Sequence, residues 1–248
     1  MATGTPPCAL DEVPLSDLAQ AAGAPARAAV DVLHLSLGRP FISRALNASS
    51  PLLSRSALLA SLGDVRVAWG GVPYAAEYGG EGAAVGPLRN FVGRFMGTAV
   101  GGEPTEGPGA ALAAPPLVFD AEVLKGPAAP LAALFARRRA LVFPRSAVRG
   151  LALQQFIMGP GGAGSSLHFH PSAVNLCLFG LKHWLLVPPA AAAFTDAPAA
   201  EWWPTRARAG PAFEVLQGPG DFVYVPDGWG HAVLNLADSL ALAFEARN

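Results

Sequence analysis

Cysteine, methionine and charged side chains are all scarce in this sequence. It has 2 cysteines, Cys8 and Cys177, and 3 methionines in 248 residues. Two cysteines are too few for a disulfide framework or a thiolate zinc module, so disulfide-rich domains and cysteine-ligated zinc domains are excluded. The 17 lysines and arginines nearly balance the 18 aspartates and glutamates, leaving a formal charge of −1. This balance argues against a nucleic-acid or anionic-membrane surface driven by bulk electrostatics.

Long apolar runs are also absent. The most apolar stretch, Val174 to Phe194, is interrupted by Lys182 and by the Pro188-Pro189 pair, so it predicts no membrane span. The first residues lack the basic and apolar regions of a secretion signal, which favours a cytoplasmic protein. One sequon, Asn47-Ala48-Ser49, would instead be glycosylated in a secretory compartment.

The N-terminal part of the sequence favours helices. Alanine- and leucine-rich segments predict helices over 16–22, 24–37 and 54–62, and Pro87 is suited to begin a further helix that runs to residue 96. A strand is expected over 65–69. Glycine, proline and alanine then dominate residues 97–116, which predicts a flexible linker. We therefore expect a helical segment over 1–96 that packs on a β domain over 117–248.

The C-terminal part favours strands. Short apolar or alternating runs recur there, each bounded by glycine, proline or aspartate. Eight such runs without a helical period predict a sandwich or barrel. The predicted strands are Leu151–Met158, Ser165–His170, Ala173–Phe179, Leu181–Val187, Phe213–Gln217, Asp221–Val225, His231–Leu236 and Ser239–Glu245. The insertion over 190–208 is expected to form a loop or a short helix at one rim.

Three of the five histidines stand where they predict a metal site. His168 and His170 lie two residues apart in one predicted strand, so their side chains should project from one face. His231 opens another predicted strand. Together the three imidazoles can bind one side of a metal ion and leave other positions free for substrate or dioxygen. A His-x-His pair alone is more often part of a polar strand face than of a metal site. The flanking segments are therefore needed to choose between these two interpretations.

Those flanking segments resemble the JmjC (jumonji, cupin-like) family of oxygenases. Ser165–Pro171 and Asn175–Pro189 resemble the centre of the domain, and Gly220–His231 resembles the motif that delivers the last metal ligand. The resemblance covers about 151–245. It implies a mainly β fold, a double-stranded β-helix (cupin/JmjC jelly roll) with N-terminal helices, and chemistry that uses Fe(II) and 2-oxoglutarate. A weaker similarity at Gly38–Ile42 extends to small JmjC proteins of the endoplasmic-reticulum lumen, which is therefore the alternative compartment.

The resemblance implies roles for individual residues. The residues that match the metal positions are His168, His170 and His231, and those that match cosubstrate positions are Lys182, Asn175 and Ser165. Lys182 matches the lysine that pairs with the distal carboxylate of 2-oxoglutarate. Other residues are expected near the site: Gln155 could point inward, and Tyr224 and Trp229 are expected to wall the pocket.

Lys182 also has a physical reason to bind an anion. It is predicted on the strand face shared with Trp184 and Leu186, and a buried ammonium there needs an anionic partner. The alternative is an exposed lysine on an edge strand, where it would oppose aggregation.

His170 departs from the family pattern, which has Asp or Glu at this position. An imidazole there removes one negative charge and leaves an Fe(II) site at +2 instead of +1. We therefore expect weaker metal retention than in the family. The leading hypothesis is an Fe(II)- and 2-oxoglutarate-dependent oxygenase that hydroxylates a protein side chain. The alternatives are a catalytically silent JmjC-like scaffold that binds a partner protein, and a protein with a three-histidine zinc site.

Overall fold

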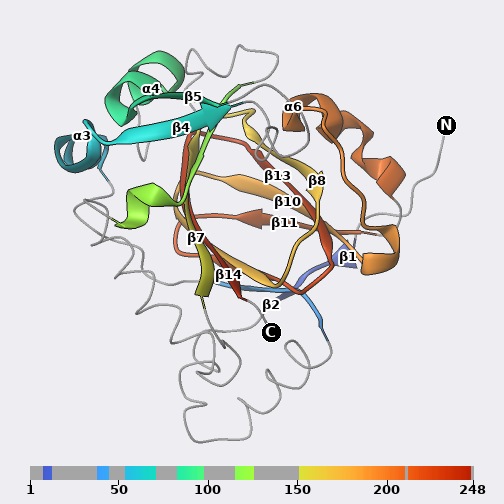
Figure 1. The fold of residues 1–248 in the computed structure, drawn as a ribbon. Helices are drawn as coiled ribbons and strands as arrows, with labels where there is room; N and C mark the ends of the chain where they lie inside the picture. The colour runs from blue at the N-terminus through green and yellow to red at the C-terminus, as the bar shows by residue number, and fades with distance from the viewer. Residues whose placement is uncertain are drawn as a thin grey trace, which may run out of the picture.

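Two facing β-sheets build the part of the chain that the structure, a computed structural model, describes: residues 8–12, 38–44, 54–70, 83–97, 115–125, 151–209 and 212–246 (Figure 1). All eight strands predicted for the C-terminal part are present, with ends within two residues of the prediction. They are β7 (Leu151–Gly159), β8 (Gly164–His168), β9 (Ala173–Phe179), β10 (Lys182–Val187), β11 (Phe213–Gln217), β12 (Phe222–Val225), β13 (Gly230–Asn235) and β14 (Ser239–Ala246).

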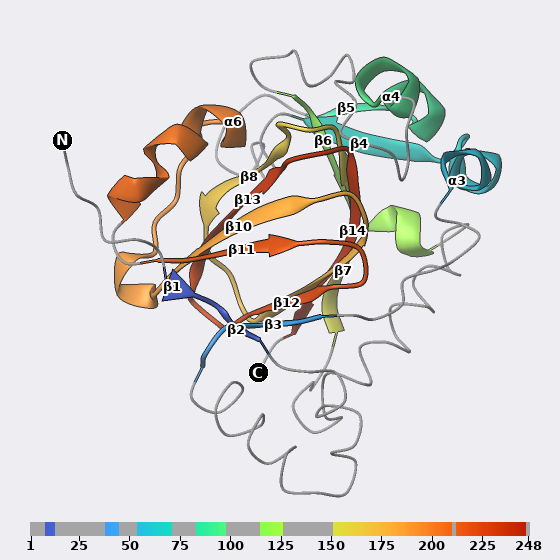
Figure 2. The same ribbon diagram turned by 180° about the vertical axis from the view of Figure 1, so that it is seen from behind.

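The strand order confirms the double-stranded β-helix. One sheet has the order β1-β11-β10-β13-β8, and the other has the order β2-β3-β12-β9-β14-β7-β6-β4-β5. From β7 to β10 the chain crosses between the sheets at every step, and it does so again from β11 to β14. The two sheets face each other across one interior, as the view from behind shows (Figure 2).

The N-terminal elements extend the nine-stranded sheet. Strands β2 (Asp11–Glu12) and β3 (Phe41–Ser43) lie beyond β12 at one end, and β6 (Leu117–Asp120), β4 (Arg66–Gly70) and β5 (Ala84–Pro87) lie beyond β7 at the other. Strand β1 (Cys8–Ala9) pairs with β11 in the five-stranded sheet.

Two predicted helices are confirmed, as α3 (Arg55–Leu62) and α4 (Leu88–Phe95). The helices predicted over 16–22 and 24–37 and nearly all of the linker over 97–116 lie outside the described residues. The division of the chain at residues 96 and 116 therefore stays a prediction. None of the helices in the described ranges combines the length and the apolar character needed to cross a membrane.

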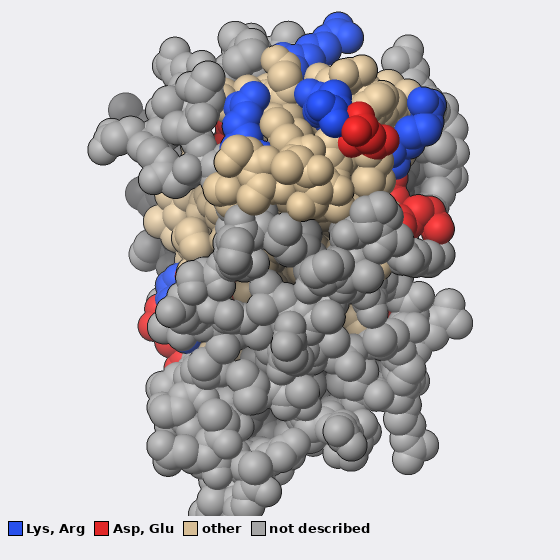
Figure 3. Space-filling model, turned by 90° about the vertical axis from the view of Figure 1, so that its left-hand side faces the viewer, with Lys and Arg blue, Asp and Glu red and all other residues tan. Residues whose placement is uncertain are grey.

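Helices α3 and α4 begin and pack as their sequences predict. The Ser54 hydroxyl accepts a hydrogen bond from the Ala57 N–H at the start of α3. Helix α4 buries Leu88, Phe91, Val92 and Phe95, a spacing that forms one apolar face. This face packs in the main core with side chains of the nine-stranded sheet, which include Phe156, Leu176, Leu242 and Phe244. On the solvent side of these helices, acidic and basic groups lie beside each other, as in the Arg89–Asp64 pair at 2.7 Å (Figure 3).

The insertion between β10 and β11 forms short helical elements at one rim, as predicted. These are a 3-10 turn, η5 (Pro189–Ala191), helix α6 (Ala199–Trp202) and a second 3-10 segment, η6 (Trp203–Ala209). A separate 3-10 turn, η4 (Glu122–Lys125), follows β6. Helix α6 lies against β8 and β13, and Trp203 packs with Leu167, Leu185 and Ala232 on the outer face of the five-stranded sheet.

A glycine sets how closely β8 approaches β13. Gly164 is the Cα partner of Leu234, and a Cβ at residue 164 would overlap the Val233 carbonyl group. Only a residue without a side chain fits this separation of the two strands. The ladder also has a bulge between His231 and Val233, which adds local twist where β8 ends.

We predict that Gly164→Ala destabilises the protein by about 1–3 kcal/mol, because the added methyl group pushes β8 away from β13. Gly93→Ala is the matched control, since a Cβ at residue 93 meets nothing within 4 Å. In the middle of α4 this exchange should raise stability by about 0.5–1 kcal/mol. Chemical denaturation measures both effects, and equal stability of the two variants would contradict the close approach.

Candidate metal centre

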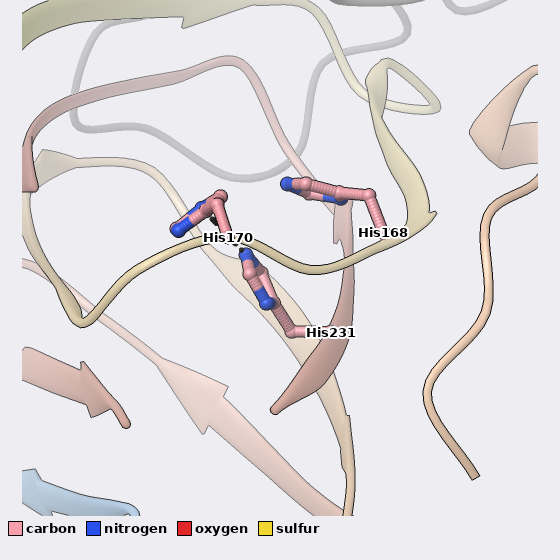
Figure 4. A group of neighbouring side chains, drawn as sticks. All are labelled: His168, His170 and His231. Atoms are coloured by element: carbon pink, nitrogen blue, oxygen red, sulfur yellow. Dashed lines mark hydrogen bonds between the residues drawn. The ribbon is translucent and has the colours of Figure 1, made fainter. Parts of the chain in front are cut away.

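The register of β8 and β13 brings two distant histidines together. His168 is the last residue of β8 and the Cα partner of His231 on β13, and their ring centroids are 4.2 Å apart. His170 follows beyond the end of β8, where its carbonyl accepts a hydrogen bond from the Gly228 N–H at 3.2 Å. Its ring centroid is 4.6 Å from that of His231 (Figure 4). The expected strand through residue 170 is therefore wrong, because β8 ends at His168, but the three imidazoles still converge.

Backbone carbonyl groups orient all three rings. The Nδ1 atoms of His168, His170 and His231 lie 2.7, 2.7 and 3.0 Å from carbonyl oxygens of residues 166, 171 and 229, respectively. A carbonyl oxygen can only accept, so in a neutral ring each Nδ1 carries the hydrogen and Nε2 is the nitrogen able to bind a metal. Such second-sphere contacts are typical of histidines that bind a metal through Nε2.

One ring nitrogen from each of the three histidines faces a shared point. One ring nitrogen of each histidine lies within 4.8 Å of the other two, and the Nε2 atoms of His170 and His231 are 3.1 Å apart. Two lone pairs at this distance repel each other unless a proton or a cation lies between them. Nitrogen ligands about 2.0–2.1 Å from a shared ion stand about 3 Å apart, so the pair fits a divalent metal.

Burial keeps two of these ligands neutral. Burial, together with the neighbouring His170, lowers the pKa of His168 to about 4. Burial and the other two histidines lower the pKa of His231 well below its usual range. Both imidazoles are therefore unprotonated at pH 7, which is the state that a metal requires.

The histidines line a cavity between the two sheets. It encloses about 440 Å³ of space between the side chains, a figure that includes its part open to solvent. Ser165, Asn175 and Gln155 line it, as expected. Tyr224 and Trp229 do not, so the prediction that they wall the pocket is wrong. Further lining residues are Phe119, Ile157, Ala173, Val174, Trp184, Val225, Val233, Ala243 and Glu245.

One polar atom in this cavity has no partner. The side-chain oxygen Oδ1 of Asn175 is buried and makes no hydrogen bond. An unpaired buried amide oxygen is unfavourable, and a water or ligand group that donates a hydrogen bond would stabilise it. A carboxylate only accepts, so a carboxylate of a cosubstrate would have to contact the NH₂ group of Asn175 instead.

Comparison with known proteins places these motifs in a family. Residues 163–245 match the family model described as "JmjC domain, hydroxylase", and all three histidines lie inside the match. Residues 163–245, about a third of the chain, are therefore similar to the JmjC domain.

Similar proteins include several with JmjC names. The "Bifunctional arginine demethylase and lysyl-hydroxylase psr-1" of Caenorhabditis briggsae is 36% identical over 103 residues, which are 32% of this chain and 26% of that protein. The human "2-oxoglutarate and iron-dependent oxygenase JMJD4" is 36% identical over 103 residues, 33% of this chain and 24% of that protein. The mouse "JmjC domain-containing protein 8" is 31% identical over 96 residues, 36% of each chain. The chain thus spans between a quarter and about a third of these relatives.

Lys182 lies inside the barrel but does not line the cavity. Its side chain is 2% exposed on β10, a central strand, so the alternative of an exposed edge lysine is wrong. It shares the inward face of β10 with Trp184, which does line the cavity. Its Nζ donates a hydrogen bond to Asn235 Oδ1 at 2.7 Å. Among the described residues no carboxylate lies within ion-pair distance of this ammonium.

Sequence reasoning did not place Trp184 or Glu245 in the cavity wall. The alternation of β14 places Ala243 and Glu245 on the cavity side, whereas Leu242 and Phe244 belong to the main core. Glu245 Oε1 lies 3.9 Å from His170 Nε2. An acidic residue at the end of an otherwise apolar strand was the signal in the sequence.

We predict that His231→Ala abolishes binding of a divalent metal, because it removes the buried ligand that contacts both other imidazoles. His183→Ala is the matched control, since His183 faces outward and pairs with Glu214 at 2.7 Å. Isothermal titration with Mn²⁺ or Co²⁺ measures both variants. Retained binding in the His231 variant would show that the three histidines are not the metal ligands.

Proposed function

We propose that this protein is an Fe(II)- and 2-oxoglutarate-dependent oxygenase that hydroxylates a side chain of another protein. The observation that carries the proposal is the convergence of three carbonyl-oriented imidazoles in an open cavity, with two Nε2 atoms 3.1 Å apart. The match of residues 163–245 to the JmjC domain and the activities in the names of the similar proteins support the same chemistry.

The chain's own residues would hold and orient the reactants. Bound Fe(II) would supply the oxidising chemistry that couples 2-oxoglutarate + O₂ + R–H to succinate + CO₂ + R–OH. His168, His170 and His231 would hold the metal. Asn175 and Ser165 on the cavity wall would contact the cosubstrate. The apolar lining, which includes Ile157 and Val233, would limit the entry of water.

Lys182 would anchor the far carboxylate of 2-oxoglutarate. Its ammonium has three donors, and the hydrogen bond to Asn235 uses one of them. A buried cation without a carboxylate partner is costly, so an incoming dicarboxylate would stabilise it. The inward position next to Trp184 puts the lysine beyond the present wall of the cavity, and a movement of its side chain would bring the ammonium to the cosubstrate.

A protein side chain is the proposed substrate because two relatives carry arginine, lysyl or lysine modification in their names. The surface beside the metal centre offers an apolar contact for such a substrate. Phe169, between the two histidines, is 38% exposed, and Phe194 is 51% exposed, with ring centroids 4.4 Å apart. For the compartment, the cytoplasm is proposed and the endoplasmic-reticulum lumen is the alternative.

Turnover of 2-oxoglutarate tests the proposal. With Fe(II), ascorbate and O₂, the protein should form succinate even without substrate, and more when its substrate is present. Lys182→Met should weaken 2-oxoglutarate binding at least tenfold and leave metal affinity unchanged, because it removes only the ammonium. Lys125→Met, in η4, is the charge-matched control. Calorimetric titration of the metal-loaded proteins measures these affinities.

The alternatives give different results in the same experiment. A protein that binds metal but neither binds nor consumes 2-oxoglutarate would have the three-histidine zinc site, because three neutral imidazoles are also the donor set of catalytic zinc. Metal analysis after purification without added metal then identifies the ion. If the protein binds neither metal nor cosubstrate, the result would favour the catalytically silent scaffold that binds a partner protein.

Cosubstrate affinity should also depend on pH. Burial lowers the pKa of Lys182 to about 8, and burial raises the pKa of the neighbouring Cys177 thiol to about 12, so no thiolate balances the ammonium. The dicarboxylate prefers the protonated lysine. Affinity should therefore be constant below pH 7 and fall about tenfold per unit well above pH 8. Titrations between pH 6.5 and 9.5 test this, and an unchanged pH dependence in Lys182→Met would contradict the role of Lys182.

A further inference from the structure

Glu245 lies where it can replace the carboxylate that the His-x-His sequence lacks. It is at the end of β14, in register with Ala173 on β9, and both side chains line the cavity. Its Oε1 atom is 3.9 Å from Nε2 of His170, the nitrogen left free for a metal. Comparison of sequence positions alone does not show this contact, because His170 and Glu245 come from opposite ends of the JmjC match.

The surroundings of Glu245 leave its charge available. No lysine or arginine of the described ranges is within ion-pair distance of it, and its ion-pair contact is to His170. Its side chain is 17% exposed, so water screens the charge only in part. The adjacent cavity residues Ala173 and Ala243 are small, which leaves room for the carboxylate to move toward a metal ion.

We propose that Glu245 supplies the negative charge of the metal centre and makes it a three-histidine, one-carboxylate site. The inference rests on the proposed metal site and adds a residue to it. The carboxylate either binds the ion or accepts a hydrogen bond from a water on the ion. In both cases it lowers the formal charge of the site from +2 to +1, and removal of the charge weakens metal retention.

Metal titration of Glu245→Gln tests the proposal, with no 2-oxoglutarate present. The amide keeps the size of the side chain and removes its charge, so affinity for Mn²⁺ and Co²⁺ should fall about ten- to hundredfold. Glu201→Gln, at an exposed position of α6, is the charge-matched control and should bind as the unmodified protein does. The visible absorption of bound Co²⁺ should also change in Glu245→Gln, because its ligand environment changes.

A second variant separates charge from structure. Glu245→Asp keeps the charge on a shorter side chain, so it should lose less metal affinity than Glu245→Gln does. Thermal unfolding of the metal-free variants shows whether each folds. If Glu245→Gln does not fold, Glu245→Ala takes its place as the variant without the charge: lower metal affinity of the folded protein supports the proposal, and unmodified affinity overturns it.

A double-mutant cycle with His170→Asp gives the sharpest test. If Glu245 supplies the missing charge, His170→Asp should improve metal affinity more in the Glu245→Gln background than alone, where two carboxylates repel each other. Equal effects in both backgrounds would overturn the inference. If Glu245→Gln binds normally while His231→Ala does not, the three-histidine site stands and only the role of Glu245 fails. If the unmodified protein binds no metal, the proposed function fails as well.

Discussion

The pairing of β8 with β13 is the constraint on which the candidate site depends. It makes His168 and His231 Cα partners, and the close approach at Gly164 holds the two strands in place. Because side chains alternate along a strand, a slip by one residue would turn one imidazole away from the other. Pairing within the five-stranded sheet opposes that slip, since β13 is also paired with β10 over its full length. The barrel therefore defines the positions of the metal ligands.

Few charged side chains lie on the inward side of the described sheets. The imidazoles of His168 and His231 are neutral because burial lowers their pKa values, so a divalent ion would bring its full charge into the cavity. Glu245 beside His170 and Lys182 beyond Trp184 are charged groups of opposite sign on the inward side of the sheets. One suits a cation and the other suits an anionic cosubstrate. This pairing of charges is what a centre that takes both a metal and a dicarboxylate requires.

Much of this arrangement could be predicted from particular residues. The alternating pattern from Leu151 to Glu245 located all eight strands, because each is bounded by residues that favour turns. The spacing of His168 and His170 and the motif before His231 predicted the three-histidine group. The expectation for Lys182 was correct about its burial and its face of β10, but its contact with Asn235 depends on the register of β10 with β13, which the sequence does not contain.

The sequence by itself determined the strands, their inward faces and the three histidines, since periodicity and turn residues are local properties. Only the tertiary structure decided that β8 ends at His168, that Tyr224 packs in the main core, and that Glu245 lies beside His170. Each of these facts is a contact between residues far apart in the chain. Such contacts depend on how two sheets close on each other, and no local pattern records that closure.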